Sequence, residues 1–443
     1  MKWKLLTLAL LLCLSFAKPV FAVENPTEVA NNKFGIHIHD ENDLIDASNL
    51  LSSSGGDWGY VTIVIRDDQR KVQEWQATFD RMRKLHLIPI VRIASKSAPQ
   101  FWEKADPDQI DDWVNFLKSL TWVTKNRYIV IGNEPNHAAE WGGSANPEEY
   151  SDYLLNFAQQ LKKASPDFFV MSAGLDASAP TNSDYMDEGL FLTRMIKKNP
   201  KLFDSIDGWS SHSYPNPGFA GAVTDTGRGS IRTFDWELTF LKTLGVTKTL
   251  PVFITETGWT HPLEDSFTEK KQDDYGRKLQ LAYETAWNDP RVIAVTPFIL
   301  NYQSPPFDMF SWKKKTGEFY SFYEMIKNLP KVKGEPKIEN SGEISAILLP
   351  EVISLNDTIY GLAYVKNTGE KIWASGVTQQ VDIEGGQIEL TPTNPLSDIE
   401  PGGIGTVLYR DISPQKQTGK TSMQFPSFFD TIGLASHVLI AQR

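Results

Sequence analysis

The sequence contains almost no cysteine and no excess of basic residues. Cys13 is the single cysteine among 443 residues, so disulfide bridges within the chain are excluded. Lysine and arginine total 44 against 55 aspartates and glutamates, which gives a net charge of −11 at pH 7. Because such a surface repels polyanions, we expect no nucleic-acid partner and no attraction to anionic membranes. A neutral or small partner is expected instead.

Long uncharged runs are also scarce, and the notable one lies near the N-terminus. Lys2 and Lys4 precede an uncharged run over Leu5–Ala17, and Val20-Phe21-Ala22 follows it. This pattern is typical of an export signal, so we predict that residues 1–22 are removed and that the protein is secreted, periplasmic or at the cell surface. A retained anchor is the alternative. The run is too short to cross a hydrocarbon core of about 30 Å, and we expect no transmembrane segment in the mature chain.

The chain up to about Leu329 alternates short apolar runs with segments of helical period. Val72, Trp75 and Phe79, for example, are spaced as on one face of a helix. Eight such strand–helix repeats predict an α/β fold, a (β/α)8 TIM barrel. A doubly wound open sheet is the alternative, but no Gly-rich dinucleotide turn follows the first strand. The eight predicted strands are Phe34–His39, Tyr60–Arg66, Ile88–Ala94, Arg127–Gly132, Phe168–Ala173, Ile206–His212, Pro251–Glu256 and Val292–Leu300.

A second domain is predicted after the barrel. Residues 331–336 form a turn-rich linker between a barrel over 23–330 and a domain over 337–443. In this last part short β-type runs alternate with Asn, Gly and Pro turns, which is typical of an all-β sandwich. Val365–Trp373 and Ile399–Gly403 resemble immunoglobulin-like accessory domains of exported bacterial enzymes. The predicted strands here are Ile344–Leu349, Thr358–Val365, Gln379–Ile383, Gly405–Tyr409 and His437–Ala441.

Two glutamates stand at the ends of predicted barrel strands. Glu134 follows the fourth strand and Glu256 ends the seventh. Functional groups of such barrels come from the carboxyl ends of the strands, where both side chains would face the mouth. Hydrolysis of a glycosidic bond needs one carboxyl group to protonate the leaving oxygen and a second to attack the anomeric carbon or activate water. The pair therefore predicts a glycoside hydrolase.

Around these glutamates the sequence resembles the clan A retaining glycoside hydrolases. Asn133-Glu134-Pro135 and Thr255-Glu256 carry the resemblance, which extends over about residues 34–329. It implies that Glu134 is the acid/base and that Glu256 is the nucleophile of a double displacement through a covalent glycosyl-enzyme intermediate. A retaining mechanism further predicts that the two carboxyl groups lie about 5 to 5.5 Å apart.

The same resemblance implies further residues at the substrate site. Asn133 would bind the sugar 2-hydroxyl, and His212 and Tyr214 would stand near the nucleophile. Arg66, at the end of the second predicted strand, would keep Glu256 ionised, because an opposite charge within about 4 to 6 Å lowers the pKa of a carboxyl group.

The resemblance weakens at the eighth predicted strand. The clan usually has a Trp there, whereas this chain has Ile299–Tyr302. Tyr302, or Trp312 in the following loop, is expected to take its place. Trp141, Trp259 and Trp312 lie in loops after strands four, seven and eight, where indole faces can stack on sugar C–H surfaces.

Two histidines of the first predicted strand leave a different chemistry open. His37 and His39 are two residues apart, share a strand face and could ligate a metal. The fifth strand of metal-dependent barrel hydrolases supplies another His, but Phe168–Ala173 has none. We therefore expect no metal, and we expect His39 to contact the sugar. A metal-dependent barrel hydrolase and a non-catalytic carbohydrate-binding barrel are the alternatives.

The sequence as a whole predicts an exported retaining glycosidase for a β-linked polysaccharide or oligosaccharide. Neither a metal nor an organic cofactor is expected. The Glu256–Trp259 run is also similar to that of endo-1,3-β-glucanases, but four residues do not identify the sugar or the linkage. The oligomeric state is left open.

Overall fold

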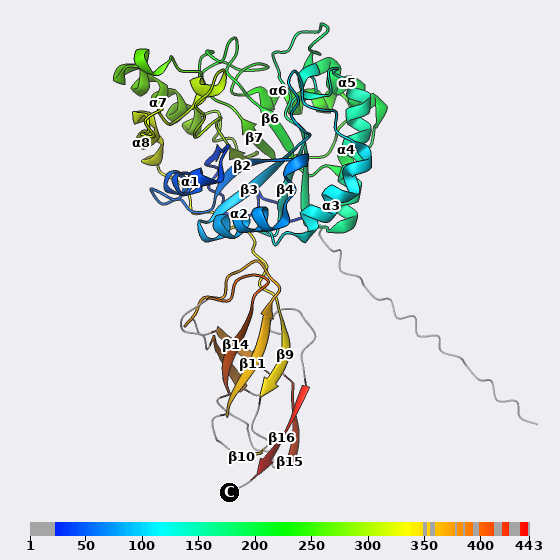
Figure 1. The fold of residues 1–443 in the computed structure, drawn as a ribbon, viewed down its shortest axis with the longest axis vertical. Coiled ribbons are helices and arrows are strands. Elements are labelled where there is room, and N and C mark those ends of the chain that lie inside the picture. Colours follow the sequence, from blue (N-terminus) through cyan, green and yellow to red (C-terminus); the bar gives the residue numbers. More distant parts are fainter. Residues whose placement is uncertain are drawn as a thin grey trace, which may run out of the picture.

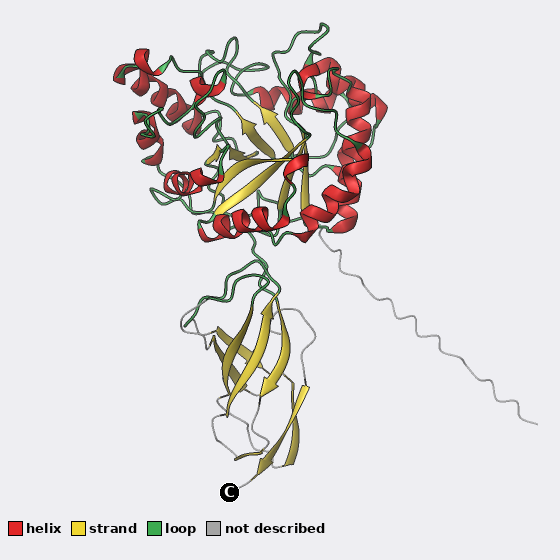
Figure 2. Ribbon diagram, viewed as in Figure 1, coloured by secondary structure: helices red, strands yellow, loops and turns green. Residues whose placement is uncertain are grey.

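A barrel of parallel strands inside a ring of helices forms the larger part of the protein, and β-sheets form the smaller part (Figures 1 and 2). The predicted export signal lies outside the described residues. The computed structural model describes residues 23–348, 352–354, 359–376, 379–383, 386–392, 398–411, 419–424 and 435–441.

All eight predicted barrel strands are present, and they form a closed circle. Parallel pairing links β1 through β5 and β6 through β8. Parallel bridges between Met171 and Gly208 and between Phe34 and Val295 join the two groups. The last strand ends at Val295 rather than Leu300, because the chain then turns across the end of β1, where the Leu300 N–H donates to the His37 carbonyl. The strands are β1 Gly35–His37, β2 Gly59–Arg66, β3 Leu87–Ala94, β4 Arg127–Ile131, β5 Phe168–Ser172, β6 Trp209–His212, β7 Val252–Glu256 and β8 Val292–Val295.

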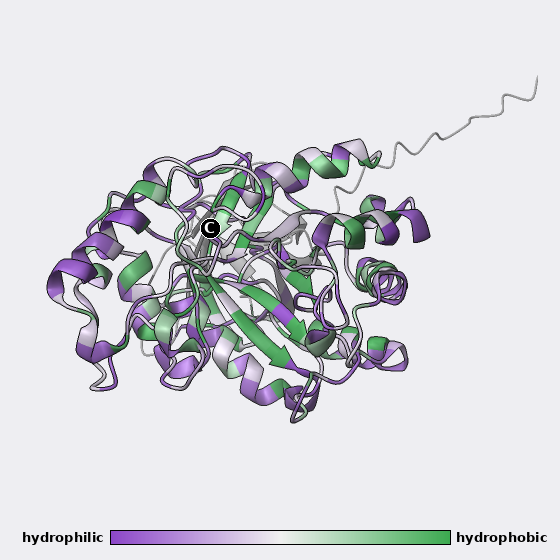
Figure 3. Cartoon of the chain, turned by 90° about the horizontal axis from the view of Figure 1, so that it is seen from above, coloured by the Kyte–Doolittle hydropathy of each residue, from purple (hydrophilic) through white to green (hydrophobic). Residues whose placement is uncertain are grey.

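Side chains fill the lower part of the barrel, so its mouth is the open end. The rings of Tyr60, Tyr128, Phe169 and Phe253 pack against one another inside it. Apolar strands lie inside helices that carry many hydrophilic residues (Figure 3). The carboxyl ends of the strands are therefore left to carry polar groups.

Helices follow the strands, and local sequence explains where they begin. The Asn146 side chain accepts from the Glu149 N–H, and Pro147 occupies the first turn of α4. In the described part of the chain, no helix is both long enough and apolar enough to cross a bilayer. The α-helices are α1 Leu44–Leu51, α2 Val72–Lys84, α3 Ile110–Ser119, α4 Pro147–Ala164, α5 Glu188–Lys198, α6 Thr233–Thr243, α7 Glu269–Glu284 and α8 Ser321–Lys327. The 3-10 helices are η1 Glu41–Asp43, η2 Asp67–Gln69, η3 Pro107–Gln109, η4 Ala138–Glu140, η5 Leu202–Ser205, η6 Glu264–Ser266 and η7 Phe307–Phe310.

Two fully buried carboxyl groups stand behind β6. Glu188 begins α5 and Glu237 lies on α6. The Trp209 indole N–H, on β6, donates to Glu237 Oε2 at 2.8 Å. Burial raises the pKa of both carboxyl groups, and the neighbouring Glu237 raises the pKa of Glu188 further. We therefore expect Glu188 to stay protonated at pH values where an exposed glutamate is ionised.

Residues 331–337, here called the strap, are bound to the barrel rather than free as a linker would be. The ammonium group of Lys331 lies 4.8 Å from the centre of the Phe34 ring. The strap's acceptors precede β1 and β2, so it lies on the face of the barrel opposite the mouth. The backbone N–H groups of Lys331, Gly334 and Glu335 donate to the carbonyls of Ser54, Asp57 and Ala30.

The described strands after the strap form two sheets. One is antiparallel throughout, with the order β12-β13-β14-β11-β9. The other has the order β10-β16-β15, with β10 parallel and β15 antiparallel to β16. The five strands predicted from the sequence correspond to β9, β11, β12, β14 and β16, whereas β10, β13 and β15 were not predicted. The immunoglobulin-like type of this domain stays a prediction. The strands are β9 Gly342–Leu348, β10 Val352–Ser354, β11 Ile359–Asn367, β12 Gln379–Ile383, β13 Gly386–Pro392, β14 Ile404–Asp411, β15 Gly419–Gln424 and β16 Ala435–Ala441.

The strap predicts how truncation affects the barrel. A barrel that ends after Asn340 keeps the strap, whereas one that ends after Pro330 loses the strap's four backbone hydrogen bonds to the barrel, among them the one that the Lys125 N–H donates to the Lys337 carbonyl. We expect the free energy of unfolding of the shorter form to be lower by about 1 to 3 kcal/mol, because the net contribution of a backbone hydrogen bond that competes with water is small. Urea unfolding of the two forms measures this difference. Equal stability would contradict a structural role for the strap.

The buried pair behind β6 predicts a pH-dependent effect of Glu188→Gln. The raised pKa of Glu188 means that the folded state binds more protons than the unfolded chain, so this contribution to stability is fully present at acid pH. It is lost as the pH rises toward the folded-state pKa, by up to about 1.4 kcal/mol per pH unit. Glutamine needs no proton, so the variant should gain stability relative to the wild type between pH 5 and pH 8. Urea unfolding of both proteins at pH 5 and pH 8 measures this gain. The same difference in unfolding free energy between variant and wild type at both pH values would refute a protonated Glu188.

Candidate active site

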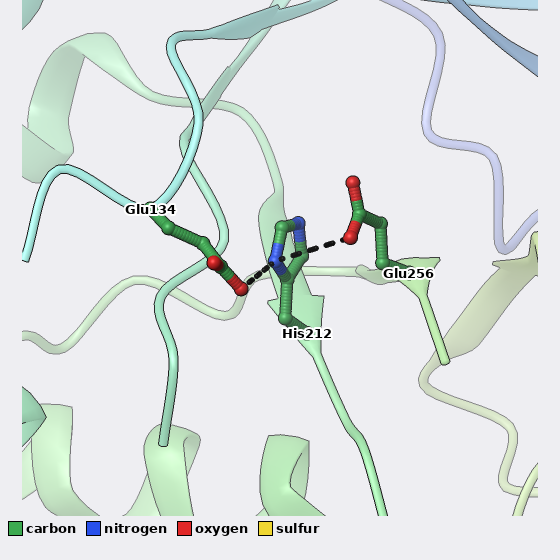
Figure 4. A group of neighbouring side chains, drawn as sticks. All are labelled: Glu134, His212 and Glu256. Carbon is green, nitrogen blue, oxygen red and sulfur yellow. Dashed lines mark hydrogen bonds and ion pairs between the residues drawn. The ribbon is translucent and has the colours of Figure 1, made fainter. Parts of the chain in front are cut away.

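Glu134 and Glu256 come together at the mouth of the barrel. Glu134 lies just beyond β4 and Glu256 is the last residue of β7. One carboxylate oxygen from each and a ring nitrogen of His212 all lie within 4.8 Å of one another. His212 projects between the two glutamates (Figure 4). The two acids that the sequence singled out thus form one site.

The backbone turn after β4 directs Glu134 into the mouth. Gly132 has a φ of 92°, in a region that suits a residue without a Cβ, and Glu134 itself has a φ of 30°. The Glu134 N–H donates to the Gly174 carbonyl at 3.1 Å, which ties the turn to the end of β5. Glycine in the sequence therefore lets the chain leave the strand sharply at this point.

Two histidines flank the Glu134 carboxylate. His212 Nδ1 is hydrogen-bonded to Glu134 Oε1 at 2.7 Å, and His137 Nδ1 lies 3.6 Å from Glu134 Oε2. The other ring nitrogen of His137 is 2.9 Å from Asp176 Oδ2. Burial lowers the pKa of His137, but Asp176 and Glu134 together raise it above its ordinary value. Sequence reasoning missed His137 and Asp176, although His137 follows Glu134 by three residues, within the same loop.

Glu256 is buried among groups that favour its charged form. The Tyr214 hydroxyl donates to Glu256 Oε2 at 3.1 Å, His212 Nδ1 lies 3.8 Å from the same oxygen, and His37 Nε2 lies 3.9 Å from Oε1. Burial alone would raise the pKa of Glu256, but His212 and Arg92 outweigh it and hold the pKa below its ordinary value. Glu256 is therefore ionised, and the placement predicted for His212 and Tyr214 agrees with the structure.

The two buried histidines at the mouth differ in charge. Burial lowers the pKa of His37 to about 3, so it is neutral at neutral pH. Burial also lowers the pKa of His212, but the carboxylates of Glu256 and Glu134 raise it overall above the ordinary value. A cationic His212 between two carboxylates balances charge that would otherwise repel.

Arg66 does not have the partner that the resemblance implied. Its guanidinium binds Asp68 at 3.0 and 3.1 Å, because that carboxylate is two residues away at the exposed end of β2. Arg92, on β3, is the arginine whose charge lowers the pKa of Glu256. The expectation for Arg66 is therefore corrected in favour of Arg92, which ends no strand and so was not considered.

Two of the three tryptophans proposed to stack on sugar are core residues. Trp259 packs against Trp287, Trp312 packs against Phe322, and each is only 1% exposed. Their position in loops misled the prediction, because these loops fold back onto the barrel and cover the rings. Trp141 is also buried but lines a cavity beside the site, so its contact with a sugar stays a prediction.

Other aromatic rings surround the Glu256 side of the mouth. Tyr302 contacts the exposed His39 edge to face, with 5.2 Å between ring centres, and also contacts Phe307. Phe298 lies between Phe307 and the buried His37. Tyr302 and His39 are thus accessible at the mouth, and their contact with a sugar stays a prediction. Phe298 was missed because the eighth strand was expected to continue through it.

Asn133 lies beside Glu134 and has an unexpected partner. Its side-chain Nδ2 donates to Glu140 Oε2 at 3.1 Å, while its Oδ1 is buried without a hydrogen-bond partner. Glu140, on η4, was not a candidate in the sequence because it ends no strand.

His37 and His39 do not form the metal-binding pair that the sequence left open. His37 is buried against Glu256, whereas His39 is exposed against Tyr302. Among the described residues, the group of His, Asp and Glu that is compact enough for a metal is Glu134, His212 and Glu256. Ligation requires a neutral imidazole, but the two carboxylates favour a proton on His212. The donor set therefore fits a hydrogen-bonded acid pair better than a metal.

No family model matches the sequence, and no curated protein matches it. Several solved structures have a similar fold. A glucosidase from Croceicoccus marinus has a TM-score of 0.51 at 11% identity, and the match covers 89% of this chain and 98% of the glucosidase.

Two polysaccharide-degrading enzymes are also among these neighbours. A GH128 (subgroup II) endo-β-1,3-glucanase from Pseudomonas viridiflava has a TM-score of 0.44 at 15% identity, with 67% of this chain and 98% of that chain covered. A β-mannanase from Thermomonospora fusca has a TM-score of 0.40 at 12% identity, with 68% and 90% covered. At these identities the similarity concerns the fold, and the structures that share it are glycoside hydrolases.

The charge difference between the buried histidines can be measured without a substrate. The chain has seven histidines, so ring resonances of 13C-labelled protein can be assigned with His37→Gln and His212→Gln variants. We expect the His212 signal to report a protonated ring above pH 6.5 and the His37 signal to stay that of a neutral ring down to pH 5. A His37 signal that titrates between pH 5 and pH 7 would contradict this charge arrangement.

Proposed function

We propose that this protein is an exported retaining glycoside hydrolase that acts on a β-linked polysaccharide or oligosaccharide. The observation that carries the proposal is the pair Glu134 and Glu256, with oxygens within 4.8 Å of each other at the barrel mouth. Retaining enzymes have carboxyl groups about 5 to 5.5 Å apart, whereas inverting enzymes need about 6.5 to 9.5 Å to admit a water molecule. The spacing favours retention.

The unlike surroundings of the two glutamates support unlike roles. Glu256 is ionised and held by Tyr214, as a nucleophile must be before it attacks the anomeric carbon. Glu134, beside His212 and His137, faces it across the mouth and would donate a proton to the leaving oxygen. The sugar would then be bonded to Glu256, and Glu134 would take a proton from the water that releases it.

His212 links the two steps through its contacts with both carboxylates. A cationic ring favours the ionised form of Glu256 before attack, and once Glu256 carries the sugar its negative charge is gone. His212 then keeps its 2.7 Å contact with Glu134, which has become the carboxylate that activates water. The arrangement supports acid and base action by one residue in turn.

The proposal predicts that the two acids respond differently to removal and to azide. Glu256→Ala lacks the nucleophile, whereas Glu134→Ala lacks only proton transfer, which is worth about 10²- to 10⁴-fold. On an aryl β-glycoside with an activated leaving group, azide should release a β-glycosyl azide from Glu134→Ala. It should attack directly in Glu256→Ala and give the α-glycosyl azide.

The control is Glu318→Ala, which removes an exposed glutamate and should leave activity unchanged. Substrates should include aryl glycosides, mannans and xylans, with β-1,3-glucans first because of the Glu256–Trp259 run. Azide rescue of neither variant, or products of the reverse configuration, would refute the assigned roles. Activity retained by both alanine variants would point to a site elsewhere.

A further inference from the structure

A cavity of about 380 Å³ opens beside the two glutamates. Loops after β2, β3 and β4 form its walls. Arg92, Asn133 and Glu140 line it on the side of the catalytic pair, and Trp102 and Trp141 line it elsewhere. The double displacement described above gives no task to Glu140, although this carboxyl group reaches the same space.

Glu140 controls which way the Asn133 amide points. The 3.1 Å contact joins Asn133 Nδ2 to Glu140 Oε2, and a carboxylate can only accept. The reversed amide would place its carbonyl oxygen against the carboxylate, where the two acceptors would repel. Among the described residues only Glu140 accepts from the Asn133 amide nitrogen, so its second N–H is left for a group in the cavity that Asn133 lines.

Glu140 lies partly buried among the charged groups of the mouth. Burial and the charges of Glu134 and Glu256 raise the pKa of Glu140, and Arg92 and the hydrogen bond from Asn133 offset this only in part. Arg92 makes no ion pair within 4 Å among the described residues, and its buried Nε has no hydrogen-bond partner. A third carboxylate at this place makes the mouth more negative beside the group that must hold a proton.

We propose that Glu140 is a positioning residue of the proposed glycosidase: it holds the Asn133 amide with its nitrogen toward a sugar hydroxyl in the cavity next to Glu134. The inference rests on the proposed function and adds a residue to it. The ligand class is a neutral sugar with vicinal hydroxyl groups, which can accept from the Asn133 amide and the Arg92 guanidinium and donate to Glu140.

The test compares Glu140→Leu and Glu140→Gln with a matched control. Leucine removes the acceptor, so kcat should fall about 10-fold or more with a smaller change in KM. Glutamine keeps an acceptor oxygen and should restore most of kcat. It removes the charge beside Glu134, so the alkaline limb of the pH profile should move to lower pH. Glu318→Gln makes the same change of charge at an exposed residue outside the cavity lining and should do neither.

Repeating the Glu140→Leu change in an Asn133→Ala variant shows whether Glu140 acts through Asn133. In Asn133→Ala, the change Glu140→Leu should lower kcat by less than about 3-fold, because the amide that it holds is already gone. An equal loss of kcat from Glu140→Leu in both backgrounds would overturn the inference. An unchanged pH profile of Glu140→Gln would overturn it as well. If Glu140→Leu does not fold, Glu140→Gln and its pH profile decide alone. A folded wild-type protein that hydrolyses no glycoside of the panel would overturn the proposed function and this inference together.

Discussion

The contact between His212 and the two glutamates is the interaction on which the rest of the site depends. Two carboxylates this close repel unless a positive group or a shared proton separates them. His212 provides the positive group, and the other residues of the mouth contact the two glutamates from either side. Tyr214 holds Glu256 on one side, while His137 and the turn at Gly132 hold Glu134 on the other.

The interior of the protein supports that contact from behind. β6 carries His212 at its end, and Trp209 at its start is fixed by Glu237. The buried pair of Glu188 and Glu237 therefore links the packing of α5 and α6 to the strand that positions the histidine. Burying these carboxyl groups costs free energy, since each must be protonated or hydrogen-bonded in the core. β6 thus connects the packing of the barrel core with the position of His212 in the site.

The sequence predicts the barrel and the meeting of Glu134 and Glu256 at its mouth well, because both depend on local pattern. Apolar runs separated by amphipathic helices define eight strands, and an acid that directly follows such a run must emerge at the mouth. Contacts between loops are not local, so they could not be found in this way. Arg92 was missed because it lies inside a strand, and Arg66 was misassigned because its neighbour Asp68 competes for it. Trp259 and Trp312 show that a loop position says little about burial.

The strap fixes more than the stability of the barrel. It fastens the chain to the end of the barrel away from the mouth, and the C-terminal sheets follow on that same side (Figure 1). The mouth and the C-terminal sheets therefore lie at opposite ends of the barrel, so a partner held by those sheets would leave the entrance to the site uncovered.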